Sequence, residues 1–215
     1  MASVSESPRL YRGISPVERR AQRRERLLEA GLELFGTDGY ADSSIRAVCA
    51  VASLNSRYFY ESFTGREDLL YHVYQSVVRE VAAVVLEATA GESTIAGQAE
   101  AGLRASWTFL AKDPRKAKVI SVEVVGVSDR LERLRRENRH AFAEILMRNA
   151  RLITGDSLEL RMDPTLTSRS LMGAVIDLQV DWINGDVDAS VDEIVEHFTK
   201  LFTAVAYASV RDPAA

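Results

Sequence analysis

The chain has 215 residues, of which 47% are apolar and 27% charged, so it can bury the core of one or two domains and has an ordinary soluble composition. Its single cysteine, Cys49, excludes an internal disulfide framework and a multi-cysteine metal site, and fits the reducing cytoplasm in which we expect the protein. The net charge of −4 is unevenly spread, because residues 9–26 hold seven arginines and two glutamates whereas residues 71–215 hold 17 basic and 21 acidic residues. A basic front end on an acidic body is expected when that end meets phosphate groups.

The N-terminal end is interpreted as a flexible basic arm over residues 1–14, because it has no apolar run and therefore no secretion signal. The best apolar run of the chain, residues 81–86, is interrupted by Glu87, so neither a membrane span nor a membrane partner is expected.

Three short-linked helices are predicted over residues 15–64, as a first domain. A capping box, Ser15 to Glu18 with proline at the first helical position, opens a helix that ends near Gly36. Ser43 or Ser44 can cap a second helix that runs through Val51, and Asn55 can cap a third over residues 56–60. A further box, residues 64–67, opens a long helix. Three helices with such tight connections are typical of a helix-turn-helix.

The third helix carries the side chains expected to contact DNA. In a helix-turn-helix the N-terminal residues of the second helix of the pair meet base edges in the major groove, and here these are Ser56, Arg57 and Tyr58. Arginine binds guanine through two parallel hydrogen bonds. Tyr60 falls near the groove wall and Arg66 at the next helix start, where each can meet a phosphate. We interpret the arginines of residues 19–26, as a group, as lying near phosphate, and Leu54, Phe59 and Phe63 as core residues.

These segments together resemble the TetR family of bacterial transcriptional regulators. Residues 27–35 (LLEAGLELF) with Gly39-Tyr40 are similar to its first helix, residues 43–49 (SSIRAVC) to its second, and residues 58–63 (YFYESF) with 66–70 (REDLL) to its recognition helix and the entry to its fourth. The resemblance implies DNA contacts at Ser44, Arg46, Tyr60 and Ser62, although Arg46 could instead pair with a carboxylate.

Four positions depart from the family pattern. Tyr58 stands at a recognition-helix position that is often a small residue in the family. Ser53 stands where the family usually has glycine in the turn, and we expect the turn to be kept. Ser62 replaces the usual basic or histidine residue, which weakens one phosphate contact. Cys49 replaces a small buried residue and is interpreted as a packing residue, with a redox sensor as the alternative.

The second domain, residues 65–215, is predicted to be helical, with breaks at residues 91–93, 113–114, 126–129, 154–164 and 184–190. The whole chain is thus expected to be all-α. The resemblance implies a mostly apolar effector pocket here, for which we favour Trp107, Phe142, Met172 and Trp182, although core packing alone would also explain large side chains. The last two helices, residues 165–184 and 190–208, have apolar positions on several sides, and the resemblance implies that they form a homodimer interface.

The sequence therefore predicts a dimeric, ligand-responsive DNA-binding transcriptional regulator. The resemblance to the family implies that it is a repressor, which a small apolar or amphipathic effector releases from a near-palindromic operator. No enzyme, cofactor or metal site is expected, because His72, His140 and His197 are far apart and no catalytic constellation stands out. Two other classes stay open: a helical small-molecule-binding or enzyme scaffold with a basic N-terminal cap, and a protein-interaction adaptor.

Overall fold

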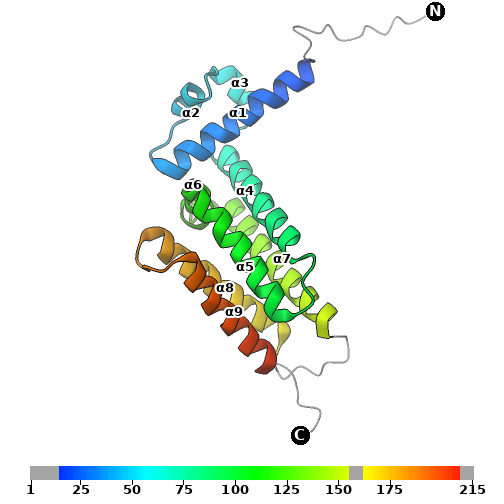
Figure 1. Cartoon of the computed structure of the whole chain (residues 1–215). Helices are drawn as coiled ribbons and strands as arrows, with labels where there is room; N and C mark the ends of the chain where they lie inside the picture. Colours follow the sequence, from blue (N-terminus) through cyan, green and yellow to red (C-terminus); the bar gives the residue numbers. More distant parts are fainter. Residues whose placement is uncertain (1–14, 155–161, 209–215) are drawn as a thin grey trace, which may run out of the picture. The chain divides into compact units, whose positions relative to one another are not determined.

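The computed structural model describes residues 15–154 and 162–208, so the predicted basic arm over residues 1–14 lies outside it. All regular secondary structure in the described residues is helical, which confirms the all-α prediction (Figure 1). The chain divides into two compact units, Met1–Val73 and Tyr74–Ala215, and the division falls inside helix α4 (Arg66–Thr89).

Unit 1 contains α1 (Pro16–Thr37), α2 (Ile45–Val51) and α3 (Ser56–Tyr60) before α4 begins. The first predicted capping box is confirmed: the Ser15 hydroxyl accepts from the Glu18 N–H at 3.1 Å, and the Glu18 carboxylate accepts from the Ser15 N–H at 2.7 Å. Ser44 rather than Ser43 caps α2, since the Ser43 hydroxyl donates to the Gly39 carbonyl instead. Local side-chain chemistry thus sets where these helices start.

The other predicted caps of unit 1 are borne out in part. Asn55 caps α3, as expected. The N–H of Thr64 donates to the Asp68 carboxylate at 3.0 Å, one residue beyond the position that the capping box predicts, and α4 begins at Arg66. The start of α4 is therefore predicted to within two residues, but the Thr64 N–H is accepted by Asp68 rather than by Glu67.

The turn between α2 and α3 is kept without glycine. Ser53 has a φ of 49°, the only positive φ of a non-glycine residue in the described part of the chain. After this turn, Phe59 and Phe63 are buried in the core, as predicted. Leu54 is only half-buried, so the prediction that it is a core residue was wrong. Leu54 follows the strained residue directly and lies in the connection, outside both helices. The core of this unit is made of Leu27, Phe35, Val48, Phe59, Phe63, Leu69, Leu70 and Val73.

Unit 2 continues with α5 (Ile95–Lys112), α6 (Pro114–Lys118), a short π-helical segment η1 (Val119–Glu123), α7 (Asp129–Thr154), α8 (Pro164–Asn184) and α9 (Val191–Ala208). Four of the five predicted breaks fall at the boundaries between these elements, and the fifth, residues 154–164, lies mostly outside the described residues. Ser190 and Glu193 form a reciprocal capping box at the start of α9, as at the start of α1. The π-helical segment was not expected, because a widened turn leaves no mark in the hydrophobic spacing.

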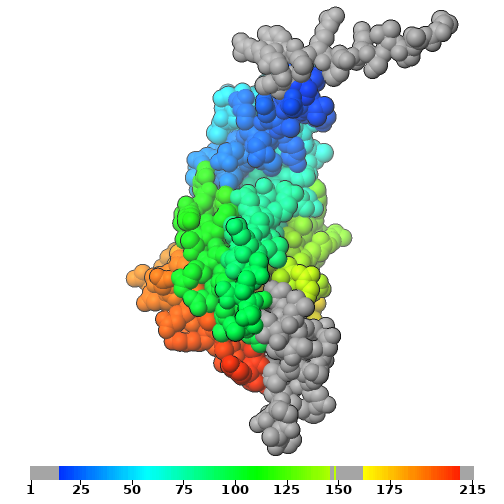
Figure 2. Space-filling view, turned by 45° about the vertical axis from the view of Figure 1, so that its right-hand side comes forward, coloured from blue at the N-terminus to red at the C-terminus, as the bar shows by residue number. Residues whose placement is uncertain are grey.

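The apolar side of α9 packs within the chain. Ile194, Phe198 and Phe202 are buried against Leu103 and Trp107 of α5. Figures 1 and 2 both show α9 (orange to red) beside α5 (green). Much of the apolar surface that led to the dimer prediction is therefore covered by α5 inside one protomer.

Helix α4 is the single helix in the described ranges that is long and apolar enough to cross a membrane by length and composition. One such helix is weak evidence for a span, because buried helices of globular proteins meet the same criterion. Here α4 buries Leu69 and Leu70 in unit 1, and Val77 and Val81 in unit 2.

Candidate nucleic-acid interface and ligand pocket

Helix α3 buries one side and exposes the other. Phe59 is fully buried, whereas Ser56, Arg57 and Tyr60 are exposed, with 84% of the Arg57 side chain open to solvent. Tyr60 remains 60% exposed, although its ring packs edge-on against Phe59. The Tyr60 ring and the Arg57 guanidinium are thus free to contact another molecule from this five-residue helix.

Glu61 organises the charges beside this exposed side. Its carboxylate pairs with Arg57 at 3.4 Å and with Arg23 of α1 at 3.3 Å, and its backbone carbonyl accepts from Arg20 at 2.6 Å. The Arg23 guanidinium also lies 4.4 Å above the ring of Tyr58, which is half-buried. Tyr58 therefore supports α1, while Arg57 lies at the exposed end of the network.

The arginines of α1 have structural partners, which the sequence did not reveal. Arg26 donates to the carbonyls of Ala52 and Ser53 in the turn, and Arg24 lies 4.5 Å from the ring of Phe63. Arg20 and Arg23 contact Glu61, as described above. Together these four arginines hold α1 against α2, α3 and the turn between them. The interpretation of these side chains as a group near phosphate missed that role, because partners 26 to 41 residues away leave no mark in local spacing.

Arg66 is tied in the same way. Its guanidinium donates to the carbonyls of Ala41 and Ser43, and lies 4.2 Å from the ring of Tyr40. These contacts bind the start of α4 to the connection between α1 and α2. A phosphate contact by Arg66 stays a prediction, and it would have to share a guanidinium that already has two carbonyl acceptors.

The remaining predicted DNA contacts lie at the edge of the same unit. Ser44 is exposed and uses its hydroxyl to accept the N–H of Ala47 as the cap of α2. Arg46 is exposed, and no described carboxylate pairs with it, so the ion-pair alternative is not seen. Ser62 is half-buried just after α3.

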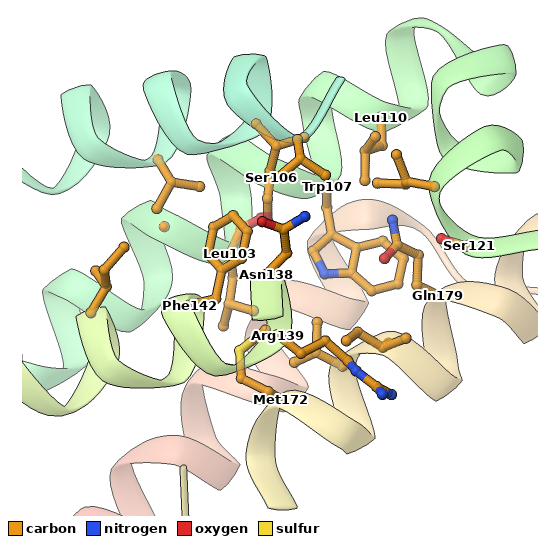
Figure 3. Close-up of a pocket in the computed structure, with 18 of the residues that line it drawn as sticks. Leu103, Ser106, Trp107, Leu110, Ser121, Asn138, Arg139, Phe142, Met172 and Gln179 are labelled. Atoms are coloured by element: carbon orange, nitrogen blue, oxygen red, sulfur yellow. The ribbon is translucent and has the colours of Figure 1, made fainter. Parts of the chain in front are cut away.

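Unit 2 contains a cavity of about 210 Å³, lined by residues of α4, α5, η1, α7, α8 and α9 (Figure 3). Three of the four predicted effector residues line it: Trp107, Phe142 and Met172. Trp182 does not. Its indole N–H donates to the Ala189 carbonyl at 2.9 Å, and its ring packs edge-on behind Trp107 at 5.4 Å. The prediction for Trp182 is corrected to a core role.

The cavity also has polar residues that the sequence analysis missed. Tyr74 is buried, which raises the pKa of its phenol, while a hydrogen bond with Asn138 and the nearby Arg135 and Arg139 act in the opposite direction. Gln179 also lines the cavity. A polar residue in an amphipathic helix is normally expected to face solvent. The sequence therefore gave no indication that these polar side chains line a cavity.

No group of three described histidine, cysteine, aspartate or glutamate residues could hold a metal ion. Cys49 is buried in unit 1, and burial raises the pKa of its thiol. A protonated, enclosed thiol is the state expected of a packing residue.

Comparisons with known proteins agree with this geometry. The family described as bacterial regulatory proteins, tetR family, matches residues 27–73. No curated protein matches the sequence. FadR of Bacillus subtilis, solved in complex with stearoyl-CoA, is similar at 16% identity and a TM-score of 0.75, over 84% of this chain and 98% of that one.

Two further solved structures are similar. A TetR/AcrR-family regulator from Thermobifida fusca is 25% identical, with a TM-score of 0.62 over 84% of this chain and 96% of that one. A tetR-family regulatory protein from Rhodococcus RHA1 is 17% identical, with a TM-score of 0.67 over 88% and 98%. Residues 27–73 thus match the TetR family of bacterial transcriptional regulators, and the described part of the chain shares the all-α fold of solved members of that family.

Proposed function

We propose that this chain is a ligand-responsive, non-enzymatic repressor, which binds a near-palindromic operator in the cytoplasm as a homodimer. The observation that carries the proposal is the exposed side of α3, where Arg57 and Tyr60 project from a short helix anchored by buried Phe59. Exposed side chains on a rigidly seated recognition helix are what base and phosphate contact requires.

Base selection is assigned to Arg57, with Ser56 beside it. A guanidinium that binds guanine through two parallel hydrogen bonds discriminates by about 1–3 kcal/mol against other bases. Because Glu61 is within 3.4 Å of this guanidinium, it can hold the side chain extended before DNA arrives. Ser44, Arg46, Tyr60 and Ser62 are assigned to phosphate or nearby contacts, which fix the register but carry no sequence information.

Helix α4 supplies the proposed coupling between ligand and DNA. It begins at Arg66, which is bonded to the connection before α2, and eight residues later Tyr74 lines the cavity. An effector that binds one position of α4 more tightly than another would change the separation of the two recognition helices in a dimer. Differential affinity for the two states is the necessary condition.

The solved relatives support a ligand response in general terms. FadR of Bacillus subtilis was solved with stearoyl-CoA, and FadR of Bacillus halodurans is described as a fatty acid degradation regulator. At 16% and 15% identity these proteins support a small-molecule effector for this chain without fixing its chemistry.

The dimer interface is assigned to the outer sides of α8 and α9. Leu166 is 66% exposed and Tyr207 79% exposed, and Gly173 and Ala174 are exposed on α8. Small residues on a helix surface allow a second helix to approach closely. Two recognition helices related by a twofold axis would then meet half-sites about 34–36 Å apart.

Footprinting on the DNA upstream of the chain's own gene tests the proposal, with an unrelated duplex as competitor. We expect a protected near-palindrome that survives the competitor and whose base preference relaxes in Arg57→Ala. Arg133→Ala, an exposed arginine of α7, removes the same charge outside unit 1 and should leave the footprint unchanged. Binding that depends on salt but not on sequence would contradict the proposal and favour the scaffold or adaptor classes.

A further inference from the structure

The cavity of unit 2 has an apolar end and a polar end. Along α4 the lining begins at Tyr74, continues with Val78, Val81 and Val85, and ends at Thr89 beside Gln98 of α5. The polar groups of Thr89 and Gln98 already donate to the backbone carbonyls of Val85 and Glu92, so they do not need a ligand as partner. On α7, Asn138 and Arg139 precede Phe142 and Ile145. Figure 3 shows Phe142 in its left half, and Asn138, Arg139, Gln179 and Ser121 in its centre and right half. A ligand that matches this cavity therefore has an apolar body and one polar head.

Two buried polar side chains of the polar end have no hydrogen-bond partner among the described residues. Gln179 is 8% exposed and Ser121 is 4% exposed. Both residues line the cavity, and their polar groups are not used in a hydrogen bond within the described part of the chain. They are therefore available to bind a polar group of a ligand.

The charge of the cavity lining is positive. The charged residues among its described lining are Arg135 and Arg139, and no carboxylate is among them. Arg135 is neutralised by Glu132, whose two oxygens each lie 2.9 Å from the guanidinium. Arg139 has no carboxylate partner in the described ranges, although it is half-buried. A half-buried cation without a counter-ion favours an anionic ligand group.

The size of the cavity limits the ligand body. An engineered cavity of about 150 Å³ in another protein holds benzene, which has six heavy atoms. In proportion, about 210 Å³ holds roughly eight heavy atoms. Octanoate, with about ten, is slightly larger than this, whereas a complete acyl-CoA is far too large to fit inside.

We propose that the cavity of unit 2 binds a compact carboxylic acid, whose carboxylate is received by Arg139 and Gln179 and whose apolar body lies along Val81, Val85 and Phe142. This inference rests on the proposed function, because it names the chemical class of the effector for the same pocket. Ser121 and Asn138 complete the polar end, while Trp107 forms part of the wall between the two ends.

Calorimetric titration of the full-length protein with three probes of equal chain length tests the head-group assignment. Octanoate is the anionic probe, octan-1-ol the neutral one and octylamine the cationic one. Because a hydrogen bond to a charged group is stronger than one to a neutral group, octanoate should bind about 10- to 100-fold more tightly than octan-1-ol. Octylamine should bind more weakly than both, since it brings a second cation beside Arg139.

Variants separate a specific site from apolar binding in general. Arg139→Gln should lower octanoate affinity to about that of octan-1-ol and leave octan-1-ol unchanged. Gln179→Leu should weaken octanoate by about fivefold or more. Arg136→Gln, an exposed arginine of the same helix, removes the same charge outside the cavity and is the matched control.

Two outcomes overturn the inference: equal affinities for octanoate and octan-1-ol, or an octanoate preference that survives Arg139→Gln. Absence of binding by all three probes also overturns it. Because the titration contains no DNA, these failures leave the DNA-binding proposal standing. Selective octanoate binding without any change in operator affinity would uphold the site and instead contradict the proposed ligand response.

Discussion

Replacing Ser53 with glycine is expected to stabilise unit 1 by about 0.5–1 kcal/mol. Ser53 has a φ of 49°, where a side chain crowds the following carbonyl and costs about 1–2 kcal/mol. Glycine removes this cost in the folded state but adds about 0.4–1 kcal/mol of chain entropy to the unfolded state. The difference favours glycine because the Ser53 side chain is exposed, and Arg26 donates to the Ser53 carbonyl rather than to its hydroxyl.

Native-state hydrogen exchange of the Phe63 amide measures this change in unit 1 directly. That amide donates to the Phe59 carbonyl at 2.9 Å and lies next to a fully buried ring, so it opens only when the unit unfolds. Since 1.4 kcal/mol corresponds to a factor of ten, its exchange should slow by about two- to fivefold in Ser53→Gly.

Two further variants isolate the cause. Ser53→Ala removes the hydroxyl but keeps the positive φ, so it should give no stabilisation. Ala50→Gly, at an exposed position of α2 three residues earlier, should destabilise by about 1 kcal/mol because the site is helical. An unchanged exchange rate in Ser53→Gly, or equal gains from glycine and alanine, would refute the argument from backbone strain.

Three other predictions concern packing, pH and the single thiol. Phe198→Ala should destabilise unit 2 by about 3–5 kcal/mol, measured by urea unfolding, because this ring lies in the core formed by α5 and α9; a loss under 1 kcal/mol would contradict that packing. The two hydrogen bonds from Arg115, both at 2.8 Å, lower the pKa of Asp113, so their stabilisation is complete above the ordinary value of 3.8 and is lost as the pH falls through the lower folded-state pKa. Arg115→Ala should flatten that acid slope of the unfolding free energy, and an unchanged slope would be inconsistent with the pair. Cys49 should react with iodoacetamide at least tenfold more slowly than in urea, because burial raises the pKa of its thiol; equal rates by mass spectrometry would show that the site is open.

Local signals explain what the sequence could predict. Ser15 with Glu18, Asn55, and Ser190 with Glu193 each act within three residues, so these helix starts were predictable from spacing alone. Phe59 was predictable as a core residue because helical periodicity separates it from its exposed neighbours.

Contacts between distant residues explain what the sequence could not predict. The carbonyls of Ala52 and Glu61 are acceptors for α1 arginines only after the chain has folded, so Arg20 and Arg26 gave no sign of a structural role. The same holds for Trp182, whose place behind Trp107 depends on the packing of α5 and α8.

The candidate pocket was likewise only half predictable. Large apolar residues such as Phe142 and Met172 are natural candidates for an apolar cavity. Gln179 is different, because it is polar, buried and without a described partner, a combination that appears only in three dimensions.

Selection of bound duplexes from a random-sequence pool tests the central claim most directly. The full-length protein should enrich a near-palindromic motif with half-sites about one helical turn apart, and Arg57→Ala should lose preference at one base pair in each half-site. Enrichment of no motif at physiological salt, or of the same motif by the wild type and Arg57→Ala, would contradict the assignment of α3 as the sequence-reading helix.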